Sequence, residues 1–211
     1  MEEKEQKIVQ GALEVFMKYG IKSVNMDDIA RSLGMSKKTL YQYVSDKNDL
    51  VSRAVAFQCE SEDKAIACIC ERKLNAIEEM FEIMTLISTM LKDIHPSIIY
   101  DLEKYHPETM KEMIKSRHQH VFYCIFNNLE RGKEEGLYRE DLNSEIIARL
   151  YVQRMHAMFD PDLFKDHKYS LTDIYYQIFN YHIRGIVSGK GIEYLNERST
   201  LPNNHINPAQ S

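Results

Sequence analysis

Apolar residues recur at steps of three and four along most of this chain, which is the spacing of helices that each bury one face. In the first segment, Ile8, Ala12, Phe16 and Tyr19 fall on one stripe. Gly20 follows directly and is suited to a left-handed helix end. The pattern predicts a helix over residues 3–19 and an all-α fold of about nine helices.

Two short helices joined by a tight turn are predicted next. Asn25 and Asp28 have the spacing of a capping box, and Gly34 ends the helix that they open. Ser36 can cap the following helix, which we place over residues 37–44. Two helices separated by such a turn are typical of a helix-turn-helix unit.

The helix over residues 37–44 has one apolar and one polar face. Leu40 and Val44 lie four residues apart and are expected to pack inward. The opposite face is rich in hydrogen-bond donors: Lys38, Thr39, Gln42 and Tyr43, with Lys37 and Tyr41 at its flanks. Such a face suits the major groove of DNA, where phosphates attract cations and base edges accept polar contacts. The alternative is a three-helix packing unit with ordinary solvated charges.

The first 50 residues or so resemble the TetR family of bacterial transcriptional regulators. The resemblance rests on residues 12–20 (ALEVFMKYG), 26–36 (MDDIARSLGMS) and 39–50 (TLYQYVSDKNDL). It implies a three-helix, helix-turn-helix DNA-binding domain followed by a helical body that dimerises and often encloses an effector pocket.

By similarity, Thr39, Tyr41, Tyr43 and Lys47 stand where the family contacts operator DNA, with Tyr41 and Lys47 on phosphates. Asp46 can cap the next helix, which puts Lys47 in its first turn. The complete expected DNA-binding set is Asn25, Ser36, Lys37, Lys38, Thr39, Tyr41, Gln42, Tyr43 and Lys47. Asn25 and Gln42 depart from the threonine and the aromatic residue frequent in the family, and this leaves the operator sequence open.

The rest of the chain keeps the helical pattern. The pattern stays helical from Leu50 to about Lys92, where a fourth helix is expected to run continuously from the DNA-binding unit into the body. Further helices are expected over about 98–104, 108–135 and 144–159. The final helix is expected to stop before Gly189. We therefore predict a DNA-binding domain over 1–47, an effector-binding and dimerisation domain over 48–195, and a flexible tail over 196–211.

The last two predicted helices have apolar surfaces wider than one buried stripe requires. In a family-like dimer they would pair with their copies in a four-helix bundle. The expected interface residues are Ile147, Leu150, Tyr151, Met155, Ile174, Ile178, Tyr181 and His182. The alternative is that these helices pack centrally in a monomer.

An effector pocket is expected only from the resemblance. Eleven methionines and twenty-one Tyr plus Phe residues offer adaptable apolar lining. The lining residues that we expect are Met80, Met84, Ile87, Tyr105, Phe122 and Phe126. Methionines at helical spacing more often belong to a core than to a ligand site.

Charge is unevenly distributed along the chain, whose formal net charge is −5. Residues 1–53 carry nine Lys and Arg against eight Asp and Glu, or +1, whereas residues 54–211 carry eighteen against twenty-four, or −6. A general nucleic-acid coat protein is excluded, and any DNA-binding face must be local. With no signal region or apolar span and four cysteines expected to be reduced, we expect a cytoplasmic protein without a membrane partner.

No cofactor, metal or catalytic site is expected. His120 and Cys124 lie four residues apart and could share a metal, but a third ligand of matching spacing is lacking. We hypothesise a dimeric repressor that binds a palindromic operator in double-stranded DNA and responds to a small-molecule effector. The alternatives are an effector-independent architectural or division-type factor on the same fold, and a helical enzyme or carrier.

Overall fold

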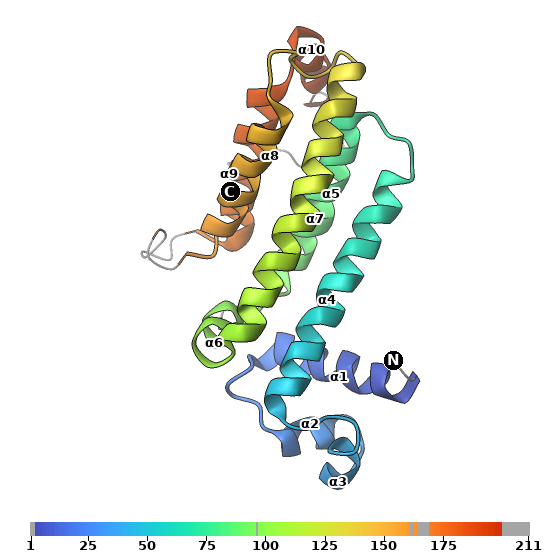
Figure 1. Ribbon diagram of the computed structural model, residues 1–211, viewed down its shortest axis with the longest axis vertical. Coiled ribbons are helices and arrows are strands. Elements are labelled where there is room, and N and C mark those ends of the chain that lie inside the picture. Colours follow the sequence, from blue (N-terminus) through green and yellow to red (C-terminus); the bar gives the residue numbers. More distant parts are fainter. Residues whose placement is uncertain (1–2, 96, 161–162, 164–168, 200–211) are drawn as a thin grey trace. The chain divides into compact units, whose positions relative to one another are not determined.

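The computed structural model describes residues 3–95, 97–160, 163 and 169–199, and it is all-α, as predicted (Figure 1). In these ranges Tyr138 and Val187 form an isolated antiparallel bridge. None of the described helices is long and apolar enough to cross a membrane. The ten helices among the described residues are α1 (Glu3–Tyr19), α2 (Met26–Ser32), α3 (Lys37–Leu40), α4 (Lys47–Cys70), α5 (Ala76–Lys92), α6 (Ile98–Tyr105), α7 (Pro107–Glu134), α8 (Ser144–Ala157), α9 (Leu171–Ile186) and α10 (Gly189–Ser199).

The chain forms two compact units. The first contains Met1–Glu71 and Leu86–His120, and the second contains Arg72–Thr85 and Val121–Ser211. Helices α5 and α7 therefore each contribute residues to both units. The helix-turn-helix segment clusters with α4 and α6 in the first unit.

The apolar stripes of α1, α2 and α4 form the core of the first unit. Ile29 and Leu40 are fully buried there and Ala30 is nearly so, which confirms the inward faces predicted for the two short helices. A Cβ atom added to Gly11 would lie 2.3 Å from Leu33 Cδ2, so the Leu33 side chain packs directly over Gly11. Tight packing of this kind holds the helix-turn-helix in one conformation.

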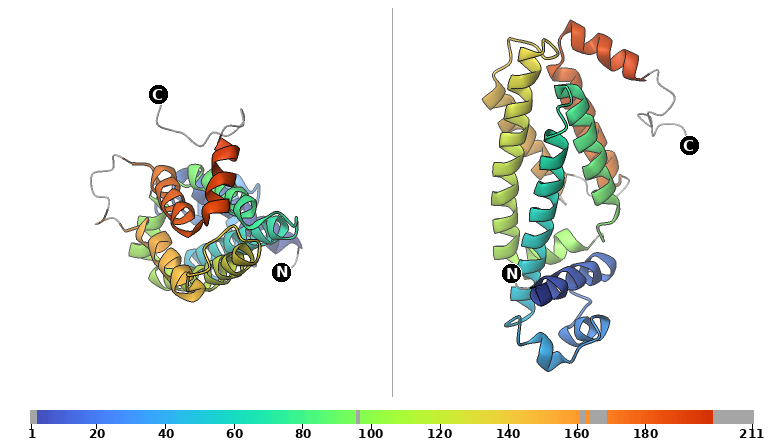
Figure 2. Two further views of the ribbon diagram at one scale, coloured as in Figure 1. Left: turned by 90° about the horizontal axis from the view of Figure 1, so that it is seen from above. Right: turned by 90° about the vertical axis from the view of Figure 1, so that its right-hand side faces the viewer.

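The core of the second unit combines aromatic and aliphatic side chains with one buried polar network. The rings of Phe81 and Phe179 meet edge to face with centroids 5.0 Å apart. Nearby, Asn128 Nδ2 donates to Glu79 Oε1 at 2.8 Å, and the hydroxyl of Tyr138 donates to Asn128 Oδ1 at 2.9 Å. Arg131 pairs with the other oxygen of Glu79 at 2.8 Å. The buried Glu79 carboxylate is therefore compensated, as burial of a charge requires. Figure 2 shows α8 and α9 side by side in this unit.

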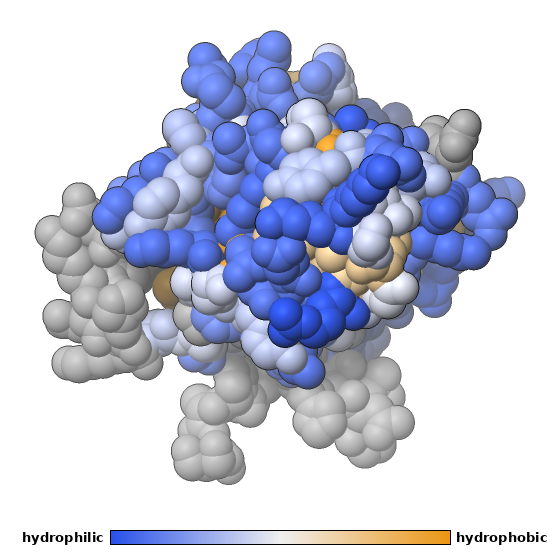
Figure 3. Space-filling view, turned by 90° about the horizontal axis from the view of Figure 1, so that it is seen from below, coloured by the Kyte–Doolittle hydropathy of each residue, from blue (hydrophilic) through white to orange (hydrophobic). Residues whose placement is uncertain are grey.

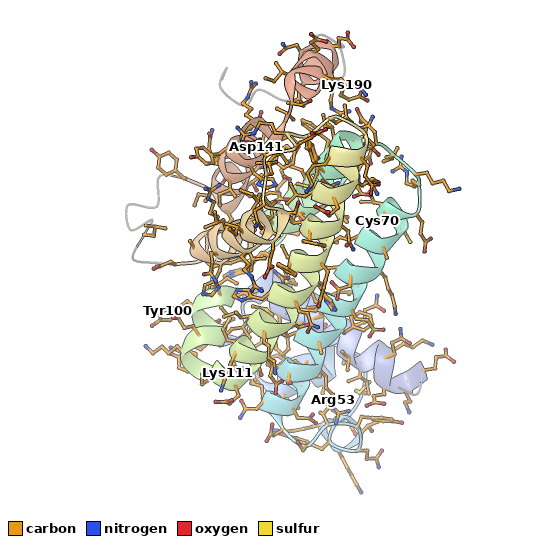
Figure 4. The ribbon with its side chains drawn as sticks, turned by 45° about the horizontal axis from the view of Figure 1, so that its top comes forward. Arg53, Cys70, Tyr100, Lys111, Asp141 and Lys190 are labelled. Carbon is orange, nitrogen blue, oxygen red and sulfur yellow. The ribbon has the colours of Figure 1, made fainter. Side chains whose placement is uncertain are left out.

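The helical pattern predicted from Leu50 to about Lys92 is divided between two helices. Helix α4 ends at Cys70, and Lys73 adopts a left-handed conformation with φ of 54° before α5 begins. Asn75 Oδ1 accepts a hydrogen bond from the backbone N–H of Glu78, so Asn75 supplies a start for the second helix. Arg53 lies near one end of α4 and Cys70 at the other (Figure 4).

Two further helix boundaries differ from the prediction. Helix α3 ends at Leu40 rather than Val44, because the N–H groups of Gln42 and Tyr43 donate to carbonyls three residues back, in the pattern of a tighter turn. Gly189 begins α10 instead of closing the chain's last helix, and α10 takes in residues 196–199 of the predicted tail. Residues 200–211 of that tail lie outside the described ranges.

Candidate DNA-binding interface

Local hydrogen bonds define the start of α3. Ser36 Oγ accepts a hydrogen bond from the N–H of Thr39 at 3.0 Å, and the two hydroxyls lie 2.8 Å apart. This confirms the predicted cap. Leu40 and Val44 are 0% and 2% exposed, so the remaining side chains of residues 37–43 are directed outward or along the surface.

The outward side of α3 and of the turn over residues 41–43 that follows it carries the polar side chains that the sequence predicted. Lys37, Lys38, Tyr41 and Gln42 are exposed, whereas Thr39 and Tyr43 are half-buried. Tyr43 lies beneath the ammonium of Lys4, which is 5.5 Å from the ring centroid. Seen from the side on which α2 and α3 lie, the surface is mostly hydrophilic (Figure 3). Such a surface can offer cations and hydrogen-bond donors to a nucleic-acid backbone.

One of these cations is already paired within the domain. Lys37 Nζ lies 2.8 Å from Asp27 Oδ2, and both side chains remain about half exposed, at 49% and 55%. The hydrogen bond to Asp27 raises the pKa of Lys37 above its ordinary value. The sequence analysis did not anticipate this pair, because the two residues belong to different helices.

Asn25 acts at the start of α2. Its Oδ1 accepts hydrogen bonds from the N–H groups of Asp27 at 2.9 Å and Asp28 at 3.0 Å, while Asp28 Oδ2 accepts from the N–H of Asn25. The predicted capping box is confirmed. The amide oxygen of Asn25 is therefore occupied by the helix, and its exposed position leaves the rest of the side chain accessible.

Lys47 is directed into the domain. Its Nζ donates hydrogen bonds to the carbonyl of Ile21, at 2.7 Å, and to that of Val24, so the first residue of α4 ties down the loop between α1 and α2. Burial lowers the pKa of Lys47, and the nearby carboxylates of Asp101 and Asp28 oppose this shift. The resemblance implied a phosphate contact for this residue, and its placement instead assigns the ammonium to loop carbonyls.

Helix α6 holds the same loop from another direction, which the sequence analysis missed. Asp101 is 3% exposed, and its Oδ2 accepts hydrogen bonds from the N–H of Lys22 at 2.9 Å and from Ser97 Oγ at 3.1 Å. A buried carboxylate requires such partners. The only hint in the sequence was an acidic residue in the first turn of a short helix, where it is ordinarily solvated.

The expected interface residues on α8 and α9 differ in how far their side chains are exposed. Leu150 and Tyr181 are exposed, at 47% and 70%. Ile147, Met155 and Ile178 are half-buried. The other three are less than 9% exposed and pack inside the second unit, so they cannot contribute much area to a contact with another chain: Tyr151, Ile174 and His182.

The expected pocket residues divide between the two units. Met80, Met84, Phe122 and Phe126 belong to the apolar cluster of the second unit, where Met80 is 2% exposed. Ile87 and Tyr105 belong to the first unit. Tyr105 is 38% exposed, and the ammonium groups of Lys22 and Lys104 lie 5.0 and 5.6 Å from its ring centroid.

The histidine and cysteine considered for a metal lie four residues apart on α7. His120 Nδ1 pairs with the Asp63 carboxylate in the first unit, whereas Cys124 belongs to the second. Among the described residues, no group of three or more His, Cys, Asp or Glu side chains is placed to hold a metal ion.

A capped α3 with a polar outer face, held on a buried three-helix core, defines a helix-turn-helix DNA-binding protein. Residues 8–54 match the family model described as "Bacterial regulatory proteins, tetR family". The HTH-type transcriptional regulator YvaF of Bacillus subtilis, which is itself uncharacterized, is 26% identical over 79% of this chain and 87% of its own length. Residues 8–54 are therefore similar to the DNA-binding segment of the TetR family of transcriptional regulators.

Solved structures share the fold at low sequence identity. A transcriptional regulator from Cytophaga hutchinsonii covers 88% of this chain and 99% of its own with a TM-score of 0.74 and 17% identity. FadR from Bacillus subtilis, solved in complex with stearoyl-CoA, covers 86% of this chain and 98% of its own with a TM-score of 0.62 and 16% identity. The likeness therefore extends through the helical body as well as the DNA-binding helices.

Proposed function

We propose that this protein is a homodimeric, ligand-responsive repressor that places residues 37–44 of each protomer in successive major grooves of a palindromic operator. The observation that carries the proposal is the exposed polar face of α3, fixed by the Ser36–Thr39 cap above the buried Leu40 and Val44. Residues 1–47 would be the DNA-binding domain, and residues 48–195 would bind the effector and dimerise.

The exposed side chains divide between the two kinds of DNA contact. Thr39 and Gln42 have short or amide side chains suited to base edges, so they would determine sequence preference. Lys37, Lys38 and Tyr41 would contact phosphates and position the helix. The remaining members of the proposed contact set would act from the edges or through the backbone: Asn25, Ser36, Tyr43 and Lys47.

Dimerisation would use the outer faces of α8 and α9. Leu150 and Tyr181 are exposed there, and Ile147, Met155 and Ile178 lie half-buried beside them. An exposed group of large apolar side chains is typical of a protein interface. A two-fold axis would match half-sites separated by about one turn of DNA, or 34–36 Å.

A small-molecule effector would control the spacing of the two DNA-binding domains. The structure of the similar FadR in complex with stearoyl-CoA supports a ligand in this fold. An effector lowers operator affinity by the ratio of its affinities for the two states of the dimer. The protein would act in the cytoplasm as a regulator and catalyse no reaction.

The test is selection of bound fragments from the host genome by the purified full chain, followed by the same binding with extracts of host cells. We expect the protein to select a symmetric site and to protect it on successive major grooves. An extract that contains the effector should release the protein from this site. Thr39→Ala should change the selected sequence, while the exposed Lys64→Ala on α4 serves as a control for charge alone. Failure to select any symmetric site at low ionic strength would overturn the proposal, and release that ignores every extract would favour an effector-independent factor.

A further inference from the structure

A group of polar side chains meets in the second unit, and one of them, Tyr151, belongs to the apolar cluster of that unit. Tyr151 on α8 and Tyr175 and His182 on α9 are 5%, 2% and 4% exposed. The rings of Tyr151 and His182 lie with centroids 4.5 Å apart, and the two phenol groups share a hydrogen bond. Cys124 on α7 lies close enough to affect both phenols. Three helices thus bring four polar side chains to one place.

One atom of this group lacks a partner. His182 Nε2 is buried and has no hydrogen-bond partner among the residues that the structure describes. Buried polar atoms in folded proteins are nearly always hydrogen-bonded, and an exception indicates a bound water or ligand group. His182 Nε2 is therefore positioned to receive a hydrogen bond from, or donate one to, a group that enters the cluster.

The imidazole of His182 and the phenols of Tyr151 and Tyr175 are uncharged at neutral pH. Burial lowers the pKa of His182 to about 4, and the positive charge of Arg154 acts in the same direction. Burial raises the pKa of both Tyr151 and Tyr175. An anionic group would lose its hydration here, and the nearby cation Arg154 already lies over the ring of Tyr181, 4.6 Å from its centroid, whereas an alcohol or ketone loses far less hydration.

The surroundings are apolar and in part adjustable. Phe81 and Phe179 are buried in the same cluster, and Phe126, Met84 and Met155 pack against it with partial exposure. Methionine side chains can change rotamer and make room for a ligand at modest cost. An apolar cluster with a few converging polar groups is typical of small-molecule sites.

We propose that this group, Cys124, Tyr151, Tyr175 and His182, binds the uncharged hydroxyl or carbonyl of an otherwise apolar effector, with His182 Nε2 as its hydrogen-bond partner. The inference rests on the proposed ligand-responsive function and names the chemical class of the ligand. It separates this chain from the similar FadR, whose bound stearoyl-CoA carries an anionic head.

The test compares three probes of equal chain length on the full-length protein by isothermal titration calorimetry: decan-1-ol, decan-2-one and decanoate. At pH 7.5 we expect the alcohol or the ketone to bind at least about tenfold more tightly than the acid. In His182→Leu this affinity should fall by about tenfold, since the partner of the polar group is removed.

Two further variants control for folding. Tyr175→Phe removes a hydroxyl of the group with little change of shape and should also weaken binding of the neutral probes. Tyr194→Phe removes a phenol hydroxyl in the same unit that contacts Asn75 and Glu78 instead, and it should bind them normally. Thermal unfolding confirms that each variant is folded.

Equal affinity for alcohol and acid, no binding of any probe, or unchanged affinity in both His182→Leu and Tyr175→Phe would overturn the inference. Calorimetry uses no DNA, so it is independent of the operator experiment. If the protein binds an operator but no neutral probe, the proposed repressor function is retained and the proposed ligand class is rejected. If it binds a neutral probe but no operator, the ligand class is retained and the repressor function is rejected.

Discussion

Lys47 and Ile21 are joined by a hydrogen bond of 2.7 Å from the ammonium to the carbonyl oxygen. This contact links the start of α4 to the loop that precedes α2, and Asp101 on α6 holds the N–H of the next residue, Lys22. Both contacts lie within the first unit. The position of the helix-turn-helix therefore depends on polar groups outside it.

Replacing Lys47 should lower the stability of the protein and have little effect on contacts with DNA phosphates. In Lys47→Ala two loop carbonyls lose a charged donor, so we expect the free energy of unfolding to fall by about 1–3 kcal/mol in urea denaturation. The exposed Lys38 offers a contrast. Lys38→Ala should leave stability unchanged and reduce the slope of log affinity against log salt by about 0.9. The opposite result, a reduced slope in Lys47→Ala with unchanged stability, would instead establish Lys47 as a phosphate contact.

Removing Asp27 should strengthen operator binding. Asp27→Asn releases Lys37 from its ion pair and removes a negative charge from the proposed interface, so we expect operator affinity to rise by about two- to tenfold at low salt. Because the pair is exposed, stability should change by less than about 1 kcal/mol. Filter binding across a salt series measures the effect. Asp28→Asn is the control, since it disrupts the capping box instead, and an unchanged affinity in Asp27→Asn would place Lys37 away from the DNA.

His182 should make the protein sensitive to mild acid. Its pKa is about 4 when folded, against about 6.5 when unfolded, so the unfolded chain takes up a proton first as pH falls. Stability is then complete above pH 6.5 and declines between 6.5 and about 4, by on the order of 3 kcal/mol. His182→Leu should flatten this part of a pH series of urea unfolding. His106, whose pKa burial also lowers, should contribute to the pH dependence that the variant retains. Identical pH profiles for wild type and variant would contradict a buried neutral imidazole.

Charges on the outer faces of α8 and α9 should disrupt the dimer. In Leu150→Glu and Tyr181→Glu an exposed apolar side chain becomes an acid that a dimer would have to bury, so we expect the dissociation constant to rise at least about tenfold. Analytical ultracentrifugation measures this dissociation constant directly. Ile192→Glu on α10 is the control: Ile192 is similarly exposed, at 50%, but lies outside the proposed interface, so this variant should leave the dimer intact. A wild-type chain that stays monomeric at working concentration would remove this interface altogether.

The elements that could be predicted from sequence are those that local hydrogen bonds define. The caps formed by Asn25, Ser36 and Asp46 each join residues two or three apart, and the structure confirms all three. Helix ends with weaker signals were missed. Asn75 begins α5 inside an unbroken apolar pattern, and Gly189 begins α10 although glycine more often follows a helix.

The sequence by itself determined the all-α class, the helix-turn-helix and the polar face of α3, because helical period, caps and turns depend on residues three or four positions apart. Only the tertiary structure decided that Lys37 pairs with Asp27, that Lys47 is directed to loop carbonyls and that buried His182 Nε2 has no hydrogen-bond partner among the described residues. Those features depend on packing between helices far apart in the chain. Burial and partner choice arise there, and no local pattern of residues specifies them.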